Sequence, residues 1–132
     1  MESGKSSFEK WTPVPNLGNR FDVSDVGWGS VTLVLDQKQP NSHIQRMQLI
    51  WEPSQIIAYH VTDETFRADC WGVDFENMGR LYVSRDSEYI EMLKQKSPLF
   101  PDNAIHFLIV GTDIIVDVLA KEYPTIKSLS AK

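Results

Sequence analysis

The feature that most constrains the fold is the run Ile105 to Val110, which reads Ile-His-Phe-Leu-Ile-Val. A strand with apolar residues on both faces has to be covered on both faces, so this run predicts a central strand inside a layered domain. His106 is its single polar residue, and we expect a hydrogen-bonded core histidine there. A chain of 132 residues has the length of one domain and buries a core of its own.

The stretch from about residue 20 to residue 61 predicts a meander of antiparallel strands. Apolar and polar residues alternate around Val23, Leu33 and Leu49, as in strands that bury one face. Turn signals such as Gly27-Trp28-Gly29 and Glu52-Pro53-Ser54-Gln55 separate the runs. Connections this short favour antiparallel neighbours.

The second half changes its period from strand-like to mixed. Ser84 is the expected N-cap of a first helix. Ile114, Ile115, Val118 and Leu119 follow the spacing of a helical packing face, which predicts a second helix. The fold class is therefore α+β. The predicted elements of this half are strands near 80–84 and 104–110 and helices near 85–96 and 112–122, packed on the sheet.

The predicted domain organisation has three parts. Residues 1–19 form a flexible tail and an extended arm, which Trp11 is suited to pin to the body. Residues 20–124 form a single α+β domain. Residues 125–132, which follow a helix-terminating proline, form a frayed C-terminal tail.

Composition and charge exclude several classes of protein. The net charge of −5 disfavours a nucleic-acid binder, which needs a basic surface to neutralise phosphates. A single cysteine, Cys70, disfavours a secreted disulfide scaffold. No apolar run opens the chain, and the most apolar window, 105–120, is interrupted by Gly111 and Asp117. We therefore expect a cytoplasmic protein with no membrane span.

Residues that often carry chemistry give no strong catalytic motif. His43, His60 and His106 lack the pairwise spacing of metal ligands, and Cys70 has acidic neighbours that oppose formation of a thiolate. We expect no catalytic residue, no metal and no cofactor. A small enzyme with a pocket around His60 or His106 and a carboxylate remains an alternative.

The segment Asp63–Glu76, here called the acidic segment, stands out from the rest of the chain. It holds five acids against one base, Arg67, and therefore most of the net negative charge. Aromatic residues lie among the acids, a combination typical of electrostatically steered interfaces. The competing interpretation is that the aromatics are buried and the acids only solvate a loop. The predicted partner-binding residues are Asp63, Glu64, Asp69, Trp71, Asp74, Phe75 and Glu76.

The second half also carries a family resemblance. The run Leu81 to Ile90, the group Asn103 and Ile105-His106-Phe107, and the run Thr112 to Leu119 resemble small bacterial immunity proteins of polymorphic and contact-dependent toxin systems. The likeness covers mainly residues 80–124 and concerns packing positions, so it implies a fold more than an activity. It implies a non-catalytic immunity protein that neutralises a cognate toxin. The charge of the acidic segment adds the expectation that the protein covers a basic active site, and we expect it to be a monomer or a homodimer. A module that self-associates through an open sheet edge is the other alternative.

Overall fold

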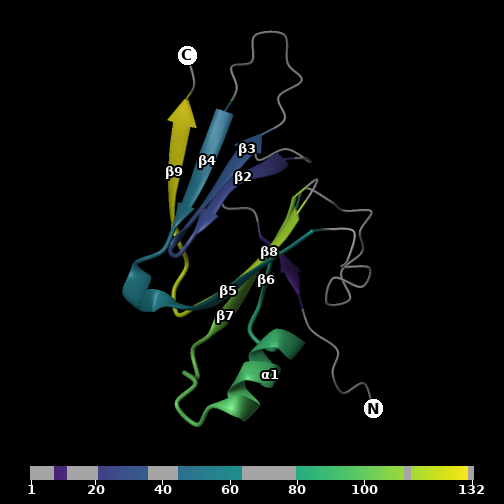
Figure 1. Ribbon diagram of the computed structural model, residues 1–132, viewed down its shortest axis with the longest axis vertical. Helices are drawn as coiled ribbons and strands as arrows, with labels where there is room; N and C mark the ends of the chain where they lie inside the picture. The colour runs from purple at the N-terminus through teal and green to yellow at the C-terminus, as the bar shows by residue number, and fades with distance from the viewer. Residues whose placement is uncertain (1–7, 12–20, 36–44, 64–79, 112–113, 131–132) are drawn as a thin grey trace.

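The computed structural model describes residues 8–11, 21–35, 45–63, 80–111 and 114–130. These residues form nine strands, one α-helix and one short 3-10 helix, and the strands build two antiparallel sheets (Figure 1). The observed class is thus mostly β, and broadly α+β as predicted. No helix in the described ranges is long and apolar enough to cross a membrane.

The first sheet has five strands in the order β1-β6-β7-β8-β5. Its middle strand, β7, is the run that the sequence places at the centre, and all six of its residues are buried. The prediction of a central strand covered on both faces is therefore confirmed. The strand bounds are β1 (Glu9–Lys10), β6 (Arg80–Ser84), β7 (Ile105–Val110), β8 (Ile114–Ala120) and β5 (Ile56–Asp63).

The second sheet has four strands in the order β2-β3-β4-β9. Its strands β2, β3 and β4 follow one another in the chain and pair as the predicted meander does. Gly29 closes the first hairpin with a φ of 98°, and a Cβ there would lie 3.0 Å from the Trp51 carbonyl oxygen. Glycine is therefore required at this turn. The bounds are β2 (Phe21–Gly27), β3 (Ser30–Leu35), β4 (Gln45–Ile50) and β9 (Thr125–Ser130).

The main core lies between the two sheets. Phe107 of β7 is at its centre and contacts the rings of Trp11, Trp51 and Tyr123. Trp11 packs against this core, so the predicted anchoring of the N-terminal arm is confirmed. The arm also contributes a strand, because β1 pairs with β6.

The opposite face of the five-stranded sheet is also buried. Leu108, Val110 and Ile115 form a second apolar cluster there, against which Phe8 packs. Helix α1 (Glu88–Lys96) lies beside the lower ends of β6 and β7 in Figure 1, and it buries Ile90. The helix begins later than expected, because Ser87 rather than Ser84 accepts the capping hydrogen bond from the backbone N–H of Ile90.

The second predicted helix, at 112–122, is wrong. Residues 114–120 form β8, which lies between β7 and β5 and is buried on both faces. The apolar side chains of Ile114, Val116 and Val118 face the main core, while Ile115 and Leu119 face the other side. A strand sandwiched in this way is continuously apolar, and β-branched residues favour it.

Two further expectations need correction. The sequence predicts a C-terminal tail that frays from residue 125, but residues 125–130 form β9, which pairs with β4 along its whole length. The last strand of the predicted meander, β5, instead joins the other sheet and pairs with β8. The 3-10 helix η1 (Pro53–Gln55) separates β4 from β5, and the Gln55 carbonyl accepts a hydrogen bond from the Lys121 backbone N–H.

Candidate functional site

The structure locates one residue of the predicted partner-binding set. Asp63 is the last residue of β5, is exposed, and lies opposite Ile114 of β8. The other predicted residues lie outside the described part of the chain: Glu64, Asp69, Trp71, Asp74, Phe75 and Glu76. Whether the acidic segment faces a partner therefore stays a prediction.

A group of exposed apolar side chains leads along β5 towards Asp63. Tyr59 and Val61 share a face of the strand with Asp63, since side chains alternate along a strand, and they are 37% and 41% exposed. Trp28, from the turn between β2 and β3, is 54% exposed and meets the Tyr59 ring at 5.9 Å between centroids. We call Trp28, Tyr59, Val61 and Asp63 the β5 surface.

The topology explains why these apolar side chains reach solvent. Tyr59 and Val61 lie opposite Val118 and Val116 of β8, which are buried in the main core. The sheet face that packs in the main core thus continues onto β5, where other side chains cover it only in part. Among the described strands β5 pairs only with β8, so it is an edge of the sheet.

His106 is the hydrogen-bonded core histidine that the sequence predicts. Its Nε2 lies 2.6 Å from Asp117 Oδ1 and its Nδ1 lies 2.7 Å from Ser87 Oγ. All three residues are fully buried. Because a carboxylate accepts, Nε2 carries the proton of that bond, and in the neutral ring Nδ1 accepts from the Ser87 hydroxyl. Ser87 Oγ also accepts from the Ile90 N–H, so the hydroxyl joins helix α1 to the sheet.

His60 approaches the same carboxylate from the surface. It lies directly opposite Asp117 in the pairing of β5 with β8, and its Nδ1 is 4.0 Å from Asp117 Oδ2. The His60 side chain is 58% exposed. Both histidines of the alternative enzyme hypothesis therefore lie near the Asp117 carboxylate, but only His106 hydrogen-bonds to it. His43 and Cys70 lie outside the described residues.

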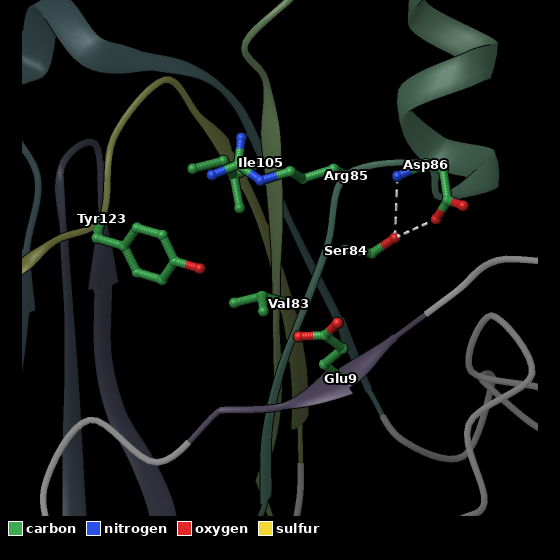
Figure 2. Close-up of a pocket in the computed structure, with 7 residues that line it drawn as sticks. All are labelled: Glu9, Val83, Ser84, Arg85, Asp86, Ile105 and Tyr123. Atoms are coloured by element: carbon green, nitrogen blue, oxygen red, sulfur yellow. Dashed lines mark hydrogen bonds between the residues drawn. The ribbon is translucent and has the colours of Figure 1, made fainter.

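A cavity of about 290 Å³ opens at the end of β6, on the face of the five-stranded sheet that packs in the main core. Figure 2 shows its interior: Val83 and Ile105 are the apolar part, and the Glu9 carboxylate and the Tyr123 hydroxyl point towards the space above Val83. The Arg85 side chain extends across the top of the same space. The cavity thus combines an apolar wall with charges of both signs.

Two further residues border this cavity and bond to each other. The Ser84 hydroxyl donates to Asp86 Oδ1 at 3.0 Å and accepts from the Asp86 backbone N–H at 3.2 Å. Sequence reasoning missed the cavity because its residues come from four separate places in the chain. It also missed Trp28 and Tyr59, although an aromatic residue between two glycines at a hairpin tip is a signal of exposure.

The three places differ in what they offer chemically. The β5 surface offers apolar area on a sheet edge, the His106 cluster offers a buried hydrogen-bond chain, and the cavity offers room for a small ligand. In comparisons with family models, curated proteins and solved structures, the chain matched none of them.

Proposed function

We propose that this protein acts by binding another protein without catalysis, as a cytoplasmic immunity protein that neutralises a cognate bacterial toxin by covering a basic active site. The observation that carries the proposal is the β5 surface, where two aromatic rings and Val61 are exposed beside an acidic residue. The acidic segment begins at that same residue, Asp63.

Physical chemistry supports a docking role for this surface. Single exposed apolar residues are ordinary on a protein, but here the Trp28 ring of the β2–β3 turn contacts the Tyr59 ring of β5, which is an edge strand among the described strands. Tyr59 and Val61 are two residues apart on one strand face, which places them about 7 Å from each other. Aromatic anchors of this kind carry much of the energy of protein interfaces, and acidic neighbours select a basic partner.

The test is rescue of a cell that expresses the proposed cognate toxin, which is sought among the genes next to this one. The wild-type chain should restore growth, and a variant with Trp28→Ser and Tyr59→Ser should fail to do so. A matched control carries Met92→Ser and Leu99→Ser, because these apolar side chains are also exposed but lie on and after α1. Equal rescue by both double variants, at equal cellular levels, would refute the role of the β5 surface.

The second candidate is a serine hydrolase, favoured by the hydrogen-bonded chain Ser87–His106–Asp117. Two features argue against it. The ring nitrogens are reversed relative to the hydrolase triad, in which Nε2 faces the serine and Nδ1 the carboxylate. In addition, Ser87 is fully buried and caps α1, so a substrate carbonyl has no approach to its oxygen. A fluorophosphonate probe decides between the candidates, since it should label Ser87 only in a hydrolase.

A further inference from the structure

The cavity at the end of β6 brings an acid and a base to one small space. Glu9 comes from β1 and Arg85 follows β6, and both are exposed towards solvent. Within the described part of the chain, neither side chain makes a hydrogen bond or an ion pair, although both line the same cavity. Each charge is therefore available to a ligand.

Tyr123 gives the cavity a fixed wall. Its ring contacts Trp11 at 5.8 Å and Phe107 at 5.3 Å between centroids, so it is held against the main core. Its hydroxyl points into the cavity in Figure 2. The core thus orients the Tyr123 hydroxyl towards the same space as the two charges. Because the ring is already held in place, little side-chain entropy is lost when a ligand binds to it.

The balance of charge limits which ligands fit. Among the described residues that line the cavity, Glu9 and Asp86 are acidic and Arg85 is the single base, so polyanions such as nucleotides are disfavoured. A simple cation would satisfy Glu9 but would face the Arg85 guanidinium across a small cavity. A molecule with one ammonium and one carboxylate group satisfies both charges together.

We propose that this cavity binds a small zwitterion with an aliphatic body, of the amino-acid class. Its ammonium group lies at the Glu9 carboxylate, and its carboxylate accepts hydrogen bonds from Arg85 and from the Tyr123 hydroxyl. Its aliphatic part covers Val83 and Ile105, the apolar part of the cavity. This site is separate from the β5 surface and does not depend on the proposed toxin.

The experiment uses the full chain and three probes of one carbon skeleton. ε-Aminocaproate carries both charges, hexylamine only the ammonium and caproate only the carboxylate. Titrations followed by NMR should show saturable binding of the zwitterion, with shifts at Val83 and Tyr123, and affinity about tenfold weaker for each single-charge probe. Glycine and γ-aminobutyrate, which are shorter, then report the separation of the two charges that the site prefers.

Substitutions assign each contact. Arg85→Gln should weaken binding of the zwitterion about tenfold but leave the weak binding of hexylamine, which has no carboxylate, unchanged. Glu9→Gln should also weaken binding of the zwitterion about tenfold but leave the weak binding of caproate, which has no ammonium group, unchanged. Glu91→Gln and Lys94→Gln, at exposed positions of α1, are the matched controls and should change nothing. The proposal is overturned if no zwitterion of the series saturates the site below about 10 mM, or if the variants and the controls bind it equally.

Discussion

Asp117 has a buried imidazole on one side and an exposed one on the other, at 2.6 Å from His106 Nε2 and 4.0 Å from His60 Nδ1. Asp117→Ala should lower the free energy of unfolding by about 3 kcal/mol, because it leaves a buried ring N–H without this acceptor and opens a cavity. Asp117→Asn should cost less, since the amide oxygen still accepts. Urea denaturation measures both, and His60→Ala is the control, with a cost below about 1 kcal/mol at its exposed position. A cost for Asp117→Ala as small as that of His60→Ala would mean that the cluster contributes nothing to the fold.

Ser87 has two structural roles: it caps α1 and it hydrogen-bonds to His106. Both roles affect stability and can be measured without any assay of activity. The Ser87 hydroxyl oxygen caps α1 at 3.2 Å from the Ile90 nitrogen and lies 2.7 Å from His106 Nδ1. Ser87→Ala should therefore destabilise the protein by about 2 kcal/mol, the sum of a lost cap and a lost buried hydrogen bond. Ser97→Ala removes the hydroxyl of a half-buried serine at the other end of α1 and should cost less than about 0.5 kcal/mol. Thermal unfolding of the two variants measures the difference. Equal midpoints for the two variants would contradict this account.

At the scale of elements, the sequence predicts strands better than it separates a buried strand from a helix. The alternation around Val23, Leu33 and Leu49 marks β2, β3 and β4, because the apolar residues of these strands face the core while polar residues such as Asp22, Thr32 and Arg46 face away from it. Residues 114–120 lack alternation, and four of their apolar residues also fit a helical face, so periodicity alone cannot decide. The β-branched residues Ile114, Ile115, Val116 and Val118 favour a strand. Asp117 does not break the strand because His106 of β7 lies beside it and supplies a hydrogen bond.

The last strand, β9, provides a test at the same scale. Ile126 is half-buried and packs against the main core, whereas its neighbour Lys127 is exposed. Ile126→Ala should therefore lower the free energy of unfolding by about 1–2 kcal/mol, and Lys127→Ala by less than about 0.5 kcal/mol. Denaturant unfolding of the two variants checks the difference. In a frayed tail neither substitution would have an effect, so equal stabilities would argue against β9.

At the scale of the whole molecule, both surface sites depend on how the chain crosses between sheets. Trp28 belongs to the four-stranded sheet and Tyr59 to the five-stranded one, and they meet because β5 leaves the meander and pairs with β8. The cavity likewise needs Glu9 and Tyr123 to reach the end of β6 from opposite parts of the chain. Local patterns report local structure, so the sequence could indicate the charge of the acidic segment but not these two sites.

Charge and apolar area should act on different steps of partner binding, if the β5 surface and the acidic segment serve one interface. Long-range attraction raises the association rate, whereas buried aromatic area slows dissociation. Replacing Asp69, Asp74 and Glu76 by Ser should therefore reduce the association rate about tenfold at low salt and flatten its dependence on ionic strength. The double variant with Trp28→Ser and Tyr59→Ser should raise the dissociation rate at least about tenfold and leave the salt dependence intact.

Surface plasmon resonance with the immobilised toxin, over a series of salt concentrations, separates these two steps. Glu52→Ser with Glu91→Ser and Glu122→Ser is the control for charge, because it also removes three acids, at exposed positions outside the acidic segment. If this control lowers the association rate as much as the acidic-segment variant does, the net charge of −5 alone steers the encounter and the acidic segment has no special place in it. If the aromatic variant changes only the association rate, Trp28 and Tyr59 are not buried in the complex, and the partner binds elsewhere.

Light scattering on the free chain tests whether the β5 edge is already occupied by a second copy. If the chain is a monomer and the aromatic substitutions leave its mass unchanged, the β5 edge is open for a partner. If the chain is a dimer that these substitutions dissociate, the edge binds a second copy of the chain.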